Sequence, residues 1–188
     1  MIKAIIFDCF GVLRPDVLRM VYRRMGGDTD ADDAFIVNTL YASHVGAISS
    51  SAPVFAERLG VSVDEWVRAL NADANDQQLL DYIETLRPDY RIGVLSNMGQ
   101  GGLLRYFTQE ELDKYFDAIA VSGEIGCAKP QAVAYETIAG RLGVDVTECV
   151  FTDDREHYCE GARVTGMQAI LYRNVEQFRR DLAPLLTV

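Results

Sequence analysis

Five short apolar runs, separated by segments of helical periodicity, constrain the fold of this chain more than any other feature. Each run is too short for a buried helix, which is typical of a central strand in a parallel sheet. The runs span residues 2–7, 92–95, 118–121, 149–151 and 169–171. Between later runs apolar residues recur three and four positions apart, as at Tyr135, Ile138 and Leu142. The alternation predicts an α/β fold with helices on both faces of a five-stranded parallel sheet.

One stretch interrupts this alternation directly after the first predicted strand. It shows helix-like segments at residues 17–25, 32–43, 53–59, 63–70 and 77–86, and no strand pattern. We therefore predict an α/β core of residues 1–13 and 89–188, with a helical cap inserted at residues 14–88. Trp66 is expected in the core of the cap. A run of acids, Asp28, Asp30, Asp32 and Asp33, is expected to be a solvated helix start.

Charge and composition restrict the partners. Lys and Arg number 18 against 28 Asp and Glu, a net charge of −10 that would repel nucleic acid and anionic membranes. No apolar run approaches the roughly 20 residues that span a bilayer, and the start lacks a signal-peptide pattern. We expect a cytoplasmic protein with no nucleic-acid or membrane partner. The four cysteines, Cys9, Cys127, Cys149 and Cys159, lack metal-site spacing and are expected to be buried thiols.

Polar side chains follow several of the predicted strands at their carboxyl ends, where open parallel sheets bind ligands. These residues are Asp8 after the first run, Ser96 and Asn97 after the second, Lys129 before a helix, and Asp153 and Asp154 after the fourth. Carboxylates are ligands that Mg²⁺ prefers, and a lysine with a hydroxyl can hold an anionic group. The sequence predicts a metal-assisted site for a small anionic substrate.

These residues and their order resemble the four motifs of the haloacid dehalogenase superfamily of Asp-nucleophile hydrolases. The matching segments are Asp8 with Gly11-Val12-Leu13, Ser96-Asn97, Lys129-Pro130 and Asp153-Asp154. Within the superfamily, the sequence of these motifs is most similar to the small-helical-cap phosphatases that resemble the N-terminal domain of soluble epoxide hydrolase and glucose-1-phosphate phosphatases. The resemblance implies a Rossmann-like three-layer core with strand order 5-4-1-2-3.

The resemblance also implies roles for individual residues. Asp8 would attack phosphorus and form an aspartyl-phosphate, which water then hydrolyses. Mg²⁺ would bind Asp8, the backbone carbonyl of Phe10 and Asp153, with support from Asp154. Ser96, Asn97 and Lys129 would bind the transferred group.

Phe10 departs from the phosphatase pattern. Phosphatases of this family carry a second Asp two residues after the nucleophile as general acid and base, and losing such a group typically costs about 10²–10⁴-fold in rate. Dehalogenases place an aromatic residue here, because a halide leaves without protonation. However, they usually have Thr where this chain has Val12, and they do not pair acids as Asp153 and Asp154 do.

Three functions therefore stay open: a Mg²⁺-dependent phosphatase slowed by Phe10, which the paired acids favour, a haloacid dehalogenase, and a non-catalytic protein that binds a phosphate compound or a partner. Phe10 itself could fill the core or line the substrate site. His44 in the cap or His157 after the fourth motif could replace the missing acid and base.

Overall fold

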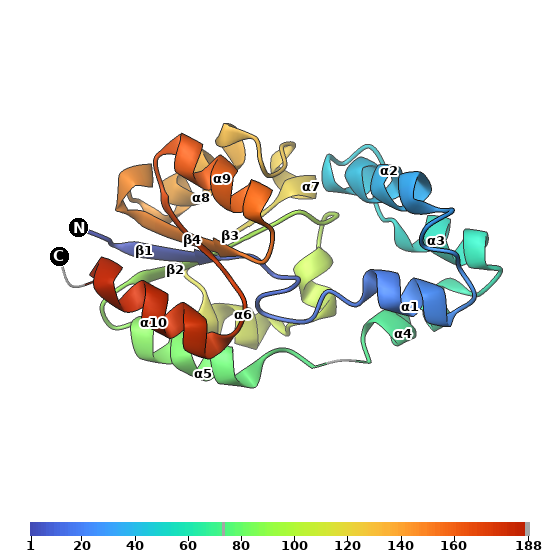
Figure 1. Cartoon of the computed structure of the whole chain (residues 1–188), viewed down its shortest axis with the longest axis horizontal. Helices are drawn as coiled ribbons and strands as arrows, with labels where there is room; N and C mark the ends of the chain where they lie inside the picture. Colours follow the sequence, from blue (N-terminus) through green and yellow to red (C-terminus); the bar gives the residue numbers. More distant parts are fainter. Residues whose placement is uncertain (73, 187–188) are drawn as a thin grey trace.

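The computed structural model describes residues 1–72 and 74–186, and its centre is a five-stranded parallel sheet (Figure 1). The strands are β1 (Ala4–Phe7), β2 (Arg91–Ser96), β3 (Ala118–Val121), β4 (Cys149–Asp153) and β5 (Gln168–Leu171). Their order is β3-β2-β1-β4-β5, with every neighbouring pair parallel. This confirms the predicted sheet and places β1, which leads to Asp8, at its centre.

Helices surround the sheet and form a separate group at one end of it (Figure 1). The cap helices are α1 (Leu18–Arg24), α2 (Asp33–His44), α3 (Ala52–Leu59) and α4 (Val63–Leu70). The others are α5 (Gln77–Leu86), α6 (Gln109–Tyr115), α7 (Ser122–Ile125), α8 (Ala132–Leu142), α9 (Glu156–Thr165) and α10 (Val175–Leu186), with 3₁₀ turns η1 (Gly102–Arg105) and η2 (Val146–Glu148). Within the described residues, none of the helices has the length and apolarity to cross a membrane.

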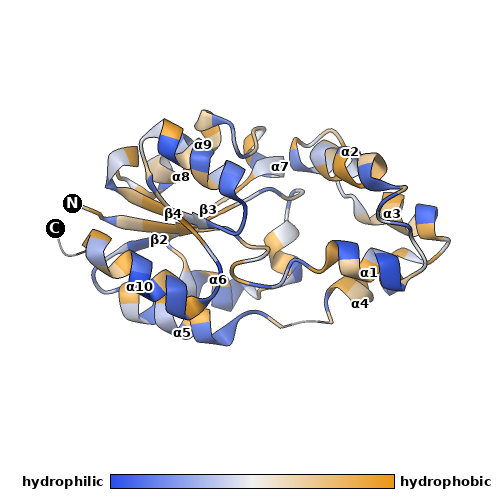
Figure 2. Ribbon diagram, viewed as in Figure 1, coloured by the Kyte–Doolittle hydropathy of each residue, from blue (hydrophilic) through white to orange (hydrophobic). Residues whose placement is uncertain are grey.

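The alternation of side chains along β1 separates two hydrophobic clusters, one on each face of the sheet. Ile5 and Phe7 belong to a cluster with buried residues of α5, α6 and α10. Ala4 and Ile6 point to the opposite face, into a cluster with α8 and α9. Figure 2 shows hydrophobic residues along the strands and hydrophilic ones on the outer helices. The core is therefore a three-layer α/β sandwich.

The cap has a hydrophobic core of its own. Val21, Tyr22, Phe55 and Trp66 lie in a third cluster that contains no strand residue. The rings of Phe55 and Trp66 are 5.4 Å apart between centroids, and Trp66 is almost fully buried. The expected place of Trp66 in the cap core is confirmed.

The acidic run does lie at the start of α2, but the prediction that it is solvated is wrong for Asp32. Asp32 is buried, accepts a hydrogen bond of 2.6 Å from the Tyr22 hydroxyl and forms an ion pair with Arg58. Because Tyr22 lies in α1 and Arg58 in α3, the Asp32 carboxylate joins three parts of the cap. A pattern of acids along the chain carries no information on partners that lie far away in sequence.

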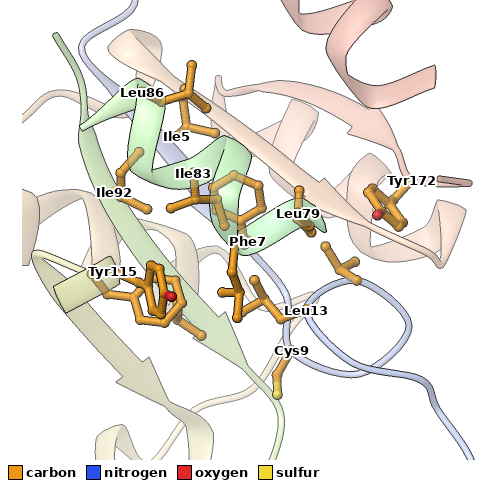
Figure 3. Packing of buried hydrophobic residues seen from close by; sticks show 14 of the residues in the cluster. Ile5, Phe7, Cys9, Leu13, Leu79, Ile83, Leu86, Ile92, Tyr115 and Tyr172 are labelled. Atoms are coloured by element: carbon orange, nitrogen blue, oxygen red, sulfur yellow. The ribbon is translucent and has the colours of Figure 1, made fainter. Parts of the chain in front are cut away.

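Helix α5, which the sequence assigns to the cap, packs against the sheet. Leu79 and Ile83 lie in the cluster of Ile5 and Phe7, as Figure 3 shows. Backbone atoms of the two linkers meet before this helix, where Asp76 N–H donates to the carbonyl of Leu13 at 2.8 Å. We therefore propose that the cap ends before α5 rather than at residue 88, because helical periodicity alone does not say which surface an apolar face covers.

The four cysteines carry free thiols. Cys9, Cys149 and Cys159 are buried as expected, whereas Cys127 is only half-buried.

Candidate active site

A tight loop after β1 presents Asp8. Its backbone N–H extends the pairing with β4 by donating to the carbonyl of Thr152 at 2.9 Å, and Gly11 N–H donates to the carbonyl of Arg14 at 2.7 Å. Gly11 has φ +83°, and a Cβ there would lie 2.4 Å from the Asp154 carboxyl group. The loop needs glycine for both its conformation and the close approach of Asp154.

Lys129 lies between two carboxylates. Its Nζ is 2.8 Å from Asp8 Oδ1 and 2.5 Å from Asp153 Oδ2. The Lys129 side chain is 1% exposed and that of Asp153 is 0% exposed. A buried ammonium with two carboxylates leaves one net negative charge, which is costly to bury without a further cation.

Asp154 completes a group of three acids. Carboxylate oxygens of Asp8, Asp153 and Asp154 all lie within 4.8 Å of one another. Asp153 Oδ1 accepts a hydrogen bond of 3.0 Å from the N–H of Arg155, but Asp154 Oδ1 is buried without a hydrogen-bond partner among the described residues. A buried oxygen without a partner, beside two further carboxylates, fits a hard divalent cation such as Mg²⁺.

The charges of the site shift its protonation equilibria. Burial raises the pKa of the Asp8 carboxyl to about 6, although Lys129 acts in the opposite direction. Burial alone would lower the pKa of Lys129, but the carboxylates of Asp8 and Asp153 raise it above its usual value. Burial, followed by the charge of Asp8, raises the pKa of Asp154. The charged form of Lys129 is thus stabilised, whereas the simultaneous ionisation of Asp8 and Asp154 in this buried site is unfavourable.

Ser96 and Asn97 come from the end of β2, and both line the cavity that contains Asp8. Ser96 is buried. The Asn97 side chain accepts a hydrogen bond of 2.8 Å from Lys129 N–H and donates one of 2.9 Å to the Lys129 carbonyl. Asn97 therefore positions the lysine backbone, and its expected contact with substrate stays a prediction.

A cavity of about 320 Å³ lies between this edge of the sheet and the cap, and residues of both line it. Asp8, Ser96 and Lys129 lie on its core side, with Phe10 beside them. Phe10 also packs against the core cluster and meets the ring of Tyr106 edge-on at 5.3 Å. The aromatic side chain thus fills the core and lines the cavity at once.

The structure separates the two histidines. His44, at the end of α2, lines the cavity, and burial, then the charges of Lys129 and Arg155, lower its pKa to about 4. His157 is exposed and is not among the described residues that line the cavity. The fold brings only His44 to the site.

The sequence patterns did not predict several polar and aromatic residues that line the cavity, and four of them make contacts at the site. Arg155 and Asp16 form an ion pair of 2.7 Å that joins the loop after β4 to the start of the cap. The Tyr158 ring lies 4.9 Å from Lys129 Nζ, and Tyr106 faces Phe10. Tyr158 follows Asp154 by one helical turn, a spacing that could have placed it near this edge, whereas nothing near Tyr106 in the sequence marks it.

Comparison with known proteins supports the sequence resemblance. The profile of the haloacid dehalogenase-like hydrolases matches residues 48–172. Phosphatase MT3486 of Mycobacterium tuberculosis (strain CDC 1551 / Oshkosh) is 32% identical over 211 residues, which cover 98% of this chain and 95% of that protein.

Solved structures share the fold. An HAD-like family hydrolase from Porphyromonas gingivalis superimposes with a TM-score of 0.79 at 24% identity, covering 100% of this chain and 99% of that one. An HAD family enzyme from Bacteroides thetaiotaomicron, in complex with magnesium and inorganic phosphate, gives a TM-score of 0.74 at 22% identity over 92% and 95% of the two chains. With the four motifs on one sheet edge and the matching profile, the chain belongs to the haloacid dehalogenase-like hydrolases.

Proposed function

We propose that this hydrolase is a Mg²⁺-dependent phosphatase that acts on a small phosphorylated metabolite, with Asp8 as nucleophile. The observation that carries the proposal is the buried group of Asp8, Asp153 and Asp154, with Lys129 Nζ in contact with two of them. The phosphatase name of the mycobacterial relative supports the same reaction class.

The acids fit Mg²⁺, and each would have a defined part in holding it. Asp8, Asp153 and the backbone carbonyl of Phe10 would be ligands, with Asp154 offering its unpartnered oxygen. When bound, the ion would supply positive charge to offset that of the transferred phosphoryl group.

The remaining chemistry belongs to side chains of this chain. An oxygen of Asp8 forms a bond to phosphorus while the bond from phosphorus to the ester oxygen breaks, and water later displaces Asp8. Lys129 and Ser96 hold the phosphoryl oxygens, and Asn97 keeps the backbone of Lys129 in place. Because Phe10 replaces a general acid and base, we expect turnover of ordinary alkyl phosphates to be slow.

Calorimetric titration with Mg²⁺ tests the metal site. The unmodified protein should bind one ion, and Asp153→Asn should weaken that binding by tenfold or more, because it removes a charged ligand. An unmodified protein that takes up no Mg²⁺ would remove the main support for a phosphatase.

A panel of phosphate esters and haloacids tests the reaction, with Asp8→Asn as the matched inactive control. We expect Mg²⁺-dependent release of phosphate that is lost in Asp8→Asn. The aromatic Phe10 on the cavity wall favours dehalogenation as a second candidate, so halide release from haloacids without phosphate release would replace the proposal. Binding of phosphate compounds without release of either product would indicate a non-catalytic protein.

A further inference from the structure

One wall of the cavity that contains Asp8 is aromatic. Phe10 follows Asp8 by two residues, and its ring meets Tyr106 edge-on at 5.3 Å between centroids. The guanidinium of Arg14 lies 4.0 Å from the Tyr106 ring centroid on a side chain that is itself buried. The wall beside the nucleophile is therefore packed from behind and presents ring surface to the cavity.

Among the described residues that line the cavity, no carboxylate or histidine takes the place of the missing acid. Its lining carboxylates are Asp8, which is the nucleophile, and Asp16, which Arg155 holds in an ion pair of 2.7 Å. His44 is uncharged near neutral pH because burial lowers its pKa to about 4, so it has no acidic proton to donate. Lys129 is held between Asp8 and Asp153. A leaving oxygen therefore has no carboxylic acid or imidazolium among these groups to protonate it, and the remaining O–H donors of aromatic side chains in the lining are the weakly acidic hydroxyls of Tyr41, Tyr106 and Tyr158.

The cap side of the cavity has an apolar part and a polar part. Aliphatic and aromatic side chains of three cap helices form the apolar part, namely Leu18, Val37, Leu40, Tyr41, Trp66 and Leu70. The polar part consists of Asp16, Arg19, Ser43, His44 and the three serines at 49–51. The volume of about 320 Å³ is at the lower end of the range for small-molecule sites. Against the apolar part of this lining, a flat apolar group fits better than a polyhydroxylated one, whose hydroxyls would lack partners there.

We propose that the site is built for phosphate esters whose leaving group departs as a stable anion, and specifically for aryl phosphates whose ring lies against Phe10 and Tyr106. This inference rests on the proposed phosphatase function and narrows its substrate class.

The step balances without an acid. An oxygen of Asp8 bonds to phosphorus, the bond from phosphorus to the aryl oxygen breaks, and the electron pair stays on the phenolate, which takes a proton from solvent after it leaves. The oxygen of a water molecule then bonds to phosphorus, the Asp8 carboxylate is released, and the protons of that water go to phosphate and solvent.

Phenyl phosphate and benzyl phosphate form a matched pair for the test. Both carry the same ring, but the benzyl ester has one extra methylene and releases a far less acidic alcohol. With the Mg²⁺-loaded protein we expect kcat/KM for phenyl phosphate to exceed that for benzyl phosphate by about 10²–10⁴-fold, the contribution of a general acid. Phe10→Asp should narrow the ratio by speeding the benzyl ester. Similar rates for the two esters with the unmodified protein would overturn the inference, whether or not the variant folds.

Two further variants test for a hidden acid. His44→Gln and Asp16→Asn should leave the phenyl-to-benzyl ratio unchanged. If either variant increases the ratio by tenfold or more, that side chain protonates the leaving oxygen and the inference is wrong.

Binding of a substrate mimic tests the aromatic wall without turnover. Phenylphosphonate cannot lose its ring, and methylphosphonate is its control. Calorimetry should give tighter binding of phenylphosphonate, and Phe10→Ala should remove most of that preference. Equal affinity for the two compounds in the unmodified protein would contradict the proposed ring site.

The outcomes also separate this inference from the proposed function. If phenyl, 4-nitrophenyl, benzyl and alkyl phosphates all release phosphate no faster than with Asp8→Asn, the phosphatase proposal itself fails. If alkyl and aryl phosphates are hydrolysed at similar rates, the phosphatase proposal stands and only the substrate class is wrong.

Discussion

The cap and the sheet edge each bury an aspartate against a basic residue, and the two arrangements differ in how far they are satisfied. In the cap, Asp32 has Arg58 and the Tyr22 hydroxyl as partners, and Arg58 reaches solvent with 54% of its side chain exposed. At the sheet edge, one buried Lys129 faces two acids, and an oxygen of Asp154 has no partner among the described residues. A satisfied buried acid stabilises its surroundings, whereas the incompletely satisfied group is arranged for a ligand.

The largest expected effect comes from removing the cation of the sheet edge. Lys129→Met keeps the length of the side chain but leaves buried carboxylates without compensation, so the free energy of unfolding should fall by about 3–5 kcal/mol. Urea denaturation without Mg²⁺ measures it. Lys3→Met is the control, because Lys3 is 57% exposed in its pair with Glu148, and such exposed pairs contribute about 0–1 kcal/mol. A loss for Lys129→Met as small as that of the control would show that the acids are not buried as anions.

Removing the buried carboxylate of the cap should lower the free energy of unfolding without changing the affinity for Mg²⁺. Asp32→Ala removes the acceptor of the Tyr22 hydroxyl and the partner of Arg58, and we expect a loss of about 1–3 kcal/mol in urea denaturation. Asp33→Ala is the matched control on the same helix, since the pair of Asp33 with Arg19 is exposed on both sides. Mg²⁺ affinity should stay constant in both variants. If Asp32→Ala changes the Mg²⁺ affinity, the conclusion that this aspartate contributes only to the stability of the cap is wrong.

Displacing Asp154 should affect the metal site more than the fold. A Cβ on Gly11 would meet the Asp154 carboxyl at 2.4 Å, so Gly11→Ala should weaken Mg²⁺ binding in calorimetry by about tenfold or more. Gly60→Ala is the control: Gly60 has a similar φ of +68°, but a Cβ there has nothing within 4 Å. Both variants should lose stability from the backbone strain, and equal Mg²⁺ affinity in the two would show that Asp154 does not contribute to the ion.

The last expected effect is a dependence of stability on pH that arises where the cap meets the cavity. The pKa of His44 is about 4 in the folded protein against 6.5 when unperturbed, so between these values the unfolded chain binds a proton that the folded one does not. The contribution is therefore present above pH 6.5 and is lost as the pH falls towards 4. Thermal unfolding of the unmodified protein and His44→Gln at pH 7 and pH 5 measures it. The unmodified protein should lose more stability on acidification, and parallel losses would exclude this origin.

The strands could be predicted because burial on both faces of the sheet makes most strand positions apolar. The apolar runs therefore marked the strands directly, and the order of the sheet followed from the family resemblance. The predicted strands stopped short of Ser96 and Asp153, which continue β2 and β4 into the site. Both are buried polar residues in strand geometry, and both lie at the edge of the sheet that carries Asp8.

What could not be predicted depends on partners far away in sequence. The apolar face of α5 could cover either the sheet or the cap, and its place on the sheet is visible only in the tertiary structure. The hydrogen bonds of the Asn97 amide with the backbone of Lys129, 32 residues further along the chain, could not be predicted from the sequence, while its contact with substrate stays a prediction. Asp32 likewise gave no sign of Arg58, 26 residues away. Local patterns indicate which residues carry chemistry, whereas their contacts are set by tertiary structure.

The hydrogen bond between Leu13 and Asp76 has a consequence for how such enzymes diversify. Arg14 reinforces it by donating to the Asn75 side chain and to the carbonyl of Leu70, so the segment that leaves the core and the one that returns are fastened together. An insertion whose ends adjoin places little constraint on the length or shape of what lies between them. Recombination at this point can exchange one lid for another while the loop that carries Asp8 is inherited unchanged.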